Sequence, residues 1–198
     1  MTDQILSDRD LDVIFREARS FKGWQDRPVS DVTIRAIYDL LRWGPTAFNA
    51  SPARFVMVQS EEAKAKLAGC AIDSNKDKIL TAPFTVVVGY DLDFPQTLPD
   101  LFKLYPGVEK LFDGNEGLTR ETAFRNSSLQ GGYLMIAARA LGLDCCPMSG
   151  FDPAAVEKAF FDGSNVKVNF LCSMGYGDKD SLPPRQERLT FDQACKIV

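Results

Sequence analysis

Phe84-Thr85-Val86-Val87-Val88-Gly89-Tyr90 is the longest β-branched apolar run in the chain and decides its fold class. β-Branched side chains restrict their own rotamers and favour an extended, pleated backbone. A continuous apolar run of this length, without polar alternation, predicts a central strand that is buried on both faces. The run is strand-sized and far short of the roughly 18 apolar residues that a membrane span requires.

Helical patterns surround this strand and outnumber the other predicted strands. The predicted helices begin at Ser7, Ser30, Glu61, Leu118 and Asp152, with a short C-terminal helix whose capping box pairs Thr190 with Gln193. The two further predicted strands are Phe55–Val58 and Lys167–Met174. Few strands, long helices and no regular alternation of the two predict a single α+β domain over residues 1–198.

Several local features of these elements can be checked against the structure. The helix that begins at Ser7 is expected to place Leu11, Ile14, Phe15 and Ala18 on one face, and the helix after Ser30 is expected to bury Ile34, Ile37, Tyr38 and Leu41. The strand 167–174 is expected to direct Val168, Phe170 and Cys172 to one face. Segment 93–117, interrupted by prolines and glycines, is expected to be a surface excursion that could cover a pocket.

Composition excludes several function classes. Of the 198 residues, 45% are hydrophobic and 25% charged, and the net charge of −4 offers no attraction to nucleic acid or anionic membranes. The start MTDQILSDRD lacks the apolar core of a secretory signal, and the five cysteines include no C-x-x-C pair, so we expect a reduced, cytoplasmic protein. The absence of histidine excludes Ser-His-Asp and Cys-His nucleophiles and histidine-ligated metals.

Four short segments carry residues that are poor choices for purely structural roles. They are Arg19–Lys22, Gly44–Pro52, Asn75–Lys78 and Pro147–Phe151. Cations and hydroxyls in the first suit a phosphate, and a glycine in the last lets a backbone approach a flat ligand and offer N–H groups. Each has an ordinary alternative: a solvated helix end, a stiff turn, a polar turn and a helix entry.

Other cofactor sites lack their sequence signals. The chain has neither the glycine pattern G-x-G-x-x-G of dinucleotide folds nor the phosphate-binding G-x-x-x-x-G-K-[ST] loop. No pair of carboxylates stands out for glycosidase-like chemistry, and no metal site is expected. Adjacent Cys145 and Cys146 are interpreted as core residues at a strand start rather than as a redox pair.

In their order and separations the four segments resemble the FMN-binding nitroreductase family over essentially the whole chain. The resemblance implies that Arg19, Ser20 and Lys22 contact the phosphate and flavin, although Ala18 occupies one expected basic position. It implies that a loop, partly from the partner subunit, contacts the flavin through Pro45, Thr46, Asn49 and Ser51, with Thr46 and Ser51 replacing the family's serine and glutamine.

Further positions carry over from the same resemblance. Asn75 and Lys78 match the pair that reaches the ribityl chain and the N1/O2 edge of the ring. Pro147, Met148, Ser149 and Gly150 match the segment that gives a backbone N–H to flavin N5, with Ser149 where many members have glutamate. Arg185 and Arg188 match a basic pair that closes on the phosphate.

The resemblance also implies an architecture and a chemistry. The expected fold is a three-layer α-β-α sandwich with a mainly antiparallel central sheet, assembled as an intertwined homodimer. The expected cofactors are FMN and, as hydride donor, NADPH or NADH. No side chain is expected to be catalytic, because flavin N5 carries the chemistry.

Within the family, the runs WGPTAFNASPAR, TAPFTVVV, ETAFRNSSLQ and PMSGFD resemble the branch that reduces malonic semialdehyde. That implies a small aldehyde as substrate, with Arg125 as the candidate for its carboxylate; the alternative is an ion pair between Arg125 and Glu121, four residues apart. Other readings stay open: a broad nitro or quinone reductase, a flavin-binding protein without turnover, and an α+β dimer without cofactor.

Overall fold

The computed structural model describes residues 5–198. Residues 1–4, which begin the segment that lacks a secretory signal's apolar core, lie outside the described residues. Its sheet contains β1 (Ala53–Val58), β2 (Phe84–Asp91), β3 (Asp144–Met148) and β4 (Val166–Gly175). The strand order is β1-β2-β4-β3 and every neighbouring pair is antiparallel. The predicted central strand is confirmed, because β2 lies between two strands and its residues 84–90 are all buried.

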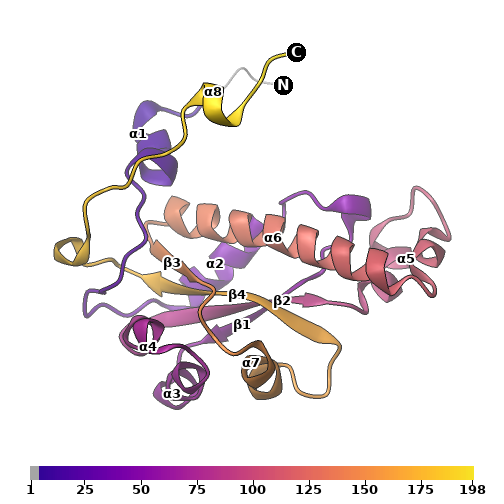
Figure 1. The fold of residues 1–198 in the computed structure, drawn as a ribbon, viewed down its shortest axis with the longest axis horizontal. Coiled ribbons are helices and arrows are strands. Elements are labelled where there is room, and N and C mark those ends of the chain that lie inside the picture. Colours follow the sequence, from indigo (N-terminus) through magenta and orange to yellow (C-terminus); the bar gives the residue numbers. More distant parts are fainter. Residues whose placement is uncertain (1–4) are drawn as a thin grey trace.

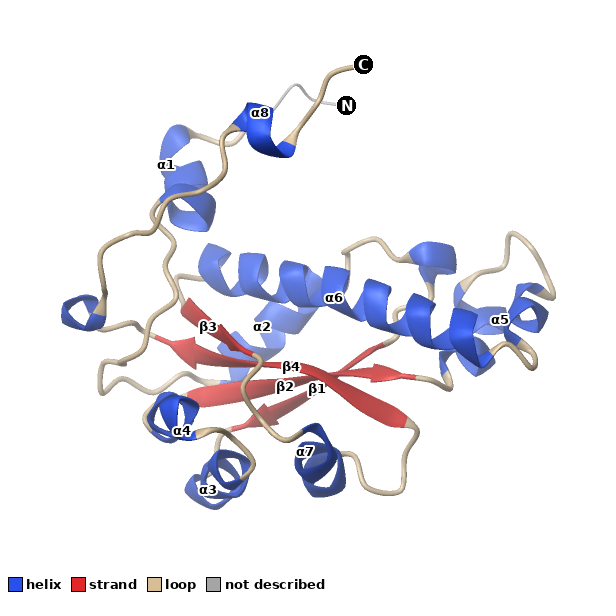
Figure 2. Cartoon of the chain, in the orientation of Figure 1, coloured by secondary structure: helices blue, strands red, loops and turns tan. Residues whose placement is uncertain are grey.

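Helices cover both faces of this sheet, as Figures 1 and 2 show. One face carries α2 (Asp31–Leu41) and the long α6 (Glu116–Ala140), and the other carries α3 (Glu61–Gly69), α4 (Asp73–Leu80) and α7 (Pro153–Phe160). Two apolar clusters fill the two interfaces, one around Phe84 and Leu134, the other around Val87 and Leu171. The expected three-layer α+β sandwich is confirmed.

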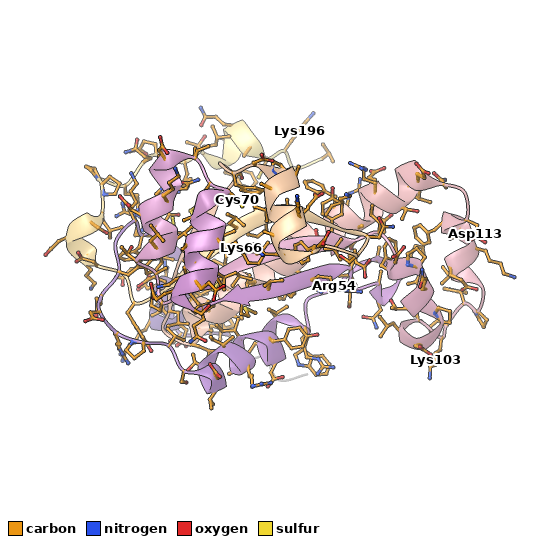
Figure 3. All side chains as sticks on the ribbon, turned by 90° about the horizontal axis from the view of Figure 1, so that it is seen from below. Arg54, Lys66, Cys70, Lys103, Asp113 and Lys196 are labelled. Carbon is orange, nitrogen blue, oxygen red and sulfur yellow. The ribbon has the colours of Figure 1, made fainter. Side chains whose placement is uncertain are left out.

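Short elements lie outside the sandwich. The excursion after β2 contains the 3-10 turn Phe94–Thr97, α5 (Leu98–Leu101) and the 3-10 turn Val108–Phe112, and Figure 3 shows Lys103 and Asp113 at its outer margin. At the chain ends, α1 (Asp8–Leu11) continues into the π-helical turn Asp12–Arg16, and α8 (Phe191–Ala194) starts at the predicted capping box. Figure 1 shows α1 and α8 projecting from the body on the side of α6.

Two sequence expectations about side-chain faces are wrong. Tyr38, expected in the buried stripe of α2, is 46% exposed. On β4, Val168 packs in the cluster of Val87, whereas Phe170 and Cys172 pack on the opposite face. The reason is a bulge between β2 and β4: Val88 pairs with Phe170 but Gly89 pairs with Val168, so Asn169 is an extra residue that reverses the alternation.

The apolar residues of the helices pack against the sheet. None of the helices in residues 5–198 combines the length and apolar character that a bilayer crossing demands. Cys145 and Cys146 are 0% and 4% exposed and pack in the two clusters on opposite faces of the sheet, which confirms their interpretation as core residues.

Candidate functional site

The segment Arg19–Lys22 lies along the free edge of β3. Ser20 forms a parallel bridge with Cys145, and the Phe21 N–H donates to the Cys145 carbonyl at 3.4 Å. Further along, Trp24 bridges Gly177. The chain therefore extends the sheet for a few residues at this edge, which fixes Arg19 and Lys22 on either side of the bridge.

Helix α4 brings Asn75 and Lys78 to the same edge. Lys78 Nζ donates to Asn75 Oδ1 at 2.8 Å, and Asn75 Nδ2 donates to the Gly150 carbonyl at 3.0 Å. Asn75 is only 6% exposed, so these two bonds satisfy an amide that would be costly to bury without partners. The Trp24 indole donates to the Lys78 carbonyl at 3.2 Å and joins this helix to the segment beside β3.

The segment after β3 packs closely against α4. A Cβ on Gly150 would lie 2.4 Å from Ile72 Cδ1 and 2.8 Å from Asn75 Nδ2, so only glycine fits here without displacing its neighbours. Pro147 is exposed on the edge strand, where its missing N–H breaks no ladder bond. No residue in the range 5–198 accepts a hydrogen bond from the Ser149 N–H, which remains available to a ligand.

Two ammonium groups converge on this edge. Burial raises the pKa of the Cys146 thiol, and the nearby charges of Lys78 and Lys22 oppose that rise. Both lysines therefore lie close enough to one buried sulfur to act on it electrostatically. The result is a positive patch framed by Asn75 and by the backbone at Gly150.

The predicted phosphate-binding arginines are only partly brought together. The Arg19 guanidinium donates to the Pro183 carbonyl, and Arg185 Nη2 donates to the Ala18 carbonyl at 3.2 Å. These reciprocal bonds hold the C-terminal segment against the segment that carries Arg19. Arg188, in the exposed tail, donates to the neighbouring carbonyls of Gln186 and Glu187 at 3.0 and 3.1 Å.

The loop Pro45–Ser51 lies away from this cluster in the same chain. It leads into β1, the edge strand opposite β3, and Ala53 pairs with Tyr90 at the far end of β2 from Phe84. Phe84 is in turn aligned with Met174 and Cys145, at the end beside Ser20. Six residues of strand separate the two ends, about 20 Å along the sheet. Residues 147–150 lie nearer the loop end of the strands, because Met148 is aligned with Leu171 and Val87, but they follow the edge strand opposite β1. One chain therefore places the loop and this segment at opposite edges of the sheet.

A cavity of about 430 Å³ lies beside the loop and includes Pro45, Asn49, Ser51 and Gln130 in its lining. A larger groove of about 860 Å³ runs between α2 and β1 and includes none of the predicted site residues. The groove with the larger volume is therefore not the place where the predicted ligand-binding residues lie. A groove along an edge strand can receive another protein segment, whereas the polar groups of Asn75 and Lys78 suit a charged ligand.

Helix α6 holds one predicted residue, Arg125, and two that the sequence reasoning missed. Arg125 Nη2 pairs with the Glu121 carboxylate while the Arg125 side chain is 67% exposed, which is the alternative left open by the sequence. Asn126 and Gln130, on the next turns of α6, were not among the predicted site residues, yet they accept hydrogen bonds from the loop N–H groups of Ala47 and Ala53. The sequence signal that could have identified them is two amide side chains four residues apart on a helix face that is otherwise made of apolar and small residues.

A family model described as the nitroreductase family matches residues 15–176, which include most of these segments. The chain belongs to the nitroreductase family. The match ends before Arg185 and Arg188, so it does not extend to the C-terminal basic pair.

Nitroreductase relatives are similar over nearly their full length. A Caulobacter sp. (strain K31) protein with the provisional name NADH dehydrogenase/NAD(P)H nitroreductase is 54% identical over 188 residues, 95% of this chain and 96% of the relative. The Ralstonia pickettii protein HadB, with the same provisional name, is 51% identical over 190 residues, 95% of this chain and 97% of its own.

Solved nitroreductase structures share the fold at low sequence identity. The Bacillus subtilis protein ydfN superimposes with a TM-score of 0.86 at 22% identity, covering 97% of this chain and all of its own. A nitroreductase-type protein from Exiguobacterium sibiricum, solved in complex with FMN, gives a TM-score of 0.84 at 21% identity and covers both chains fully. These likenesses confirm the nitroreductase-like fold expected from the sequence.

Proposed function

We propose that this nitroreductase-family chain binds FMN and passes hydride from NADPH or NADH to a small acceptor. The observation that carries the proposal is the bonded set of Lys78, the buried Asn75 and the Gly150 carbonyl, beside the free Ser149 N–H. When bound, FMN supplies the hydride chemistry, which suits a chain without histidine. The family membership and the FMN complex of the Exiguobacterium protein support the choice of cofactor.

The residues present fit such a group. Lys78 and Lys22 would place positive charge at the N1/O2 edge of the ring, in a partly buried site where preorganised charge acts strongly. The Ser149 N–H would donate at N5. The missing Cβ of Gly150 lets Ile72 and Asn75 pack directly against its backbone, which holds the Asn75 amide beside the segment that would contact the ring.

The phosphate would be held at the junction of the two chain ends. Arg19 and Arg185 already face each other's segments there and would turn from backbone carbonyls to phosphate oxygens, which form stronger, charge-assisted bonds. Arg188, farther along the exposed tail, and Ser20 would complete this set. Each exchange replaces a neutral acceptor with an anionic one.

We propose a homodimer in which Pro45, Thr46, Asn49 and Ser51 reach the flavin from the partner subunit. The loop lies beside edge strand β1 and residues 147–150 follow the opposite edge strand β3, with β2 and β4 between them; this supports the dimer, because one chain does not bring its two sheet edges together. Large apolar side chains are also exposed at 80% for Trp43, 49% for Phe124, 48% for Leu129 and 60% for Phe191. The burial of such side chains against a second subunit would stabilise a dimer.

For the acceptor we propose malonic semialdehyde, reduced to 3-hydroxypropanoate in the cytosol. The similarity of the four sequence runs to that branch supports this substrate. The free state of all five cysteines fits a reducing compartment. Arg125 would have to exchange Glu121 for the substrate carboxylate, and the proton for the product would come from water, a hydroxyl or the flavin.

The main alternative is a broad nitro or quinone reductase, which the provisional names of the Caulobacter and Ralstonia relatives favour. It would use the same FMN residues and differ in the acceptor pocket. A flavin-binding protein without turnover is a further alternative, and it differs by not accepting hydride from NADPH. Turnover with malonic semialdehyde and with nitrofurazone separates the two enzymes.

The cofactor assignment is tested with the double variant Lys78→Ala/Arg185→Ala. We expect it to lose flavin during purification, with the wild type keeping it. Lys76→Ala is the matched control, because Lys76 lies on the same helix and pairs with the exposed Asp73 at 2.7 Å. Full flavin retention by the double variant, at unchanged melting temperature, would remove the assignment.

A further inference from the structure

The loop that precedes β1 holds an unfavourable backbone. Phe48, Asn49 and Ser51 have φ angles of 53°, 52° and 43°, in the left-handed region that residues with a Cβ rarely occupy. Three such residues within four positions persist only where the surroundings fix them. The loop therefore depends on outside contacts for its shape.

Helix α6 supplies two of these contacts through buried amides. Asn126 Oδ1 accepts the Ala47 N–H at 2.8 Å, and Gln130 Oε1 accepts the Ala53 N–H at 2.9 Å. The two amides are four residues apart and so lie on one face of the helix, one turn from each other. Their bonds bracket the left-handed residues on both sides, which holds the two ends of the loop at a fixed distance.

The orientation of Asn126 is itself fixed. Its Nδ2 donates to the Thr122 carbonyl at 2.8 Å, which leaves Oδ1 to face the loop. Inside the loop, Thr46 Oγ1 accepts the Ser51 N–H at 3.1 Å, and on its outer side Asn49 Nδ2 donates to the Leu101 carbonyl at 3.0 Å. Thr46, Asn49 and Ser51 are thus held in one arrangement before any ligand arrives.

A purely structural role explains these amides poorly. Asn126 is 3% exposed and Gln130 5%, and a helix that only packs on a sheet gains nothing from burying polar side chains there. Apolar residues of the same size would pack as well without the cost of removing an amide from water. The side-chain oxygens of both amides accept hydrogen bonds from backbone N–H groups of the loop. Packing on the sheet alone does not explain these bonds.

We propose that Asn126 and Gln130 are positioning residues that preorganise loop 45–53 for contact with the flavin of the partner subunit. The proposal rests on the proposed function for the identity of the ligand, and on the hydrogen bonds alone for the control of the loop. It assigns a role to the run ETAFRNSSLQ, which lies outside the four ligand-contacting segments. Preorganisation lowers the ordering cost that a ligand would otherwise meet on binding.

The test compares Gln130→Met, which keeps the length and loses the acceptor, with Gln130→Glu, which keeps an acceptor oxygen. Ser128→Ala is the matched control: Ser128 lies on the same helix and bonds Phe124 and Asn169, and has no bond to the loop. Amide hydrogen exchange is measured on the flavin-free dimer, and FMN affinity is measured by flavin fluorescence.

For Gln130→Met we expect loop amides 47–53 to exchange about tenfold faster and FMN to bind about tenfold more weakly, as the loss of one bond to a buried N–H predicts. Exchange in β2 and β4 should not change, and Gln130→Glu should recover both properties in part. Unchanged loop exchange, or acceleration shared equally by the whole sheet, would overturn the positioning role.

Two further outcomes separate this proposal from the function. Faster loop exchange with unchanged FMN affinity would overturn the positioning proposal and leave the FMN assignment on Lys78 and Arg185 intact. A wild-type protein that takes up no FMN would overturn the proposed function and, with it, the flavin part of this proposal. The exchange data would still decide whether the amides control the loop.

Discussion

At the scale of single residues, Asn75 is the centre of the candidate site. Its amide donates to Gly150 and accepts from Lys78, so one buried side chain sets the distance between a cation and the backbone after β3. The sequence predicted Asn75, Lys78 and Gly150 as separate contacts to one ligand. It could not predict that they bond to each other, because that contact depends on how α4 packs on the edge of the sheet.

Gly150→Ala tests this arrangement. The added methyl group would meet Ile72 and Asn75 at 2.4 and 2.8 Å and push the amide away from Lys78. We expect a loss of about 1–3 kcal/mol in the free energy of unfolding, as for other overpacked sites, together with weaker FMN binding. Gly69→Ala is the control, because no atom lies within 4 Å of its added Cβ. Equal effects of the two substitutions in urea unfolding would contradict the account.

Asp144, at the start of β3, gives a pH prediction. Burial raises the pKa of its carboxyl group, opposed by the Gly177 N–H, Arg139 and Lys179. The folded protein therefore binds this proton more tightly than the unfolded chain. The corresponding stability is present below the unfolded pKa, about 3.9, and is lost as the pH rises through the folded pKa.

Asp144→Asn should remove this dependence. An asparagine oxygen can still accept from Gly177, whose N–H lies 2.9 Å from the aspartate. We expect a flatter plot of unfolding free energy against pH for the variant, from about pH 4 upward, measured by urea titration. Parallel plots for the two proteins would show that the carboxyl titrates alike in both states.

At the scale of elements, α6 lies unusually close to the sheet. A Cβ on Gly131 would lie 2.5 Å from the Phe170 ring, so the helix approaches β4 at a position where only glycine fits. The preceding residue, Gln130, accepts a hydrogen bond from the Ala53 N–H, where the loop enters β1. The same close approach therefore supports both the packing of the helix and the shape of the loop.

Gly131→Ala should destabilise the protein by about 1–3 kcal/mol, because Phe170 would have to move within a filled core. Gly117→Ala, in the first turn of the same helix, meets nothing closer than 3.9 Å and should be neutral or slightly stabilising. Thermal unfolding of both variants decides the point. A neutral Gly131→Ala would mean that α6 packs less closely than described.

The elements themselves were largely predictable, and the errors have local causes. Periodicity located β2, α6 and the capped helix starts, since these patterns extend over many residues. The face of Val168 was wrong because a one-residue bulge reverses the alternation and leaves no mark in composition. Tyr38 was assigned to a buried face that this chain alone does not cover.

At the scale of the whole molecule, the predicted site residues fall into two groups at opposite edges of the sheet. The order of the strands in the sheet separates these groups in space. No local pattern encodes this separation, since it depends on the antiparallel order β1-β2-β4-β3. A two-fold dimer is the simplest assembly that rejoins the groups, once for each of two sites.

Subunit complementation tests that assembly. A chain with Lys78→Ala and a chain with Asn49→Ala/Ser51→Ala, carrying different affinity tags, are co-expressed and purified as the heterodimer. One of its two sites would combine the intact Lys78 of one chain with the intact loop of the other, so about half of the wild-type flavin and turnover should return. A heterodimer as inactive as both parent homodimers would place each site within one chain.

The central claim, hydride transfer through bound FMN, is tested most directly by the anaerobic absorption spectrum of the purified protein. We predict a flavin spectrum that bleaches when NADPH is added and returns when malonic semialdehyde follows. Bleaching without recovery would retain the flavin reductase and remove the aldehyde as substrate. A colourless protein that takes up no added FMN would contradict the account.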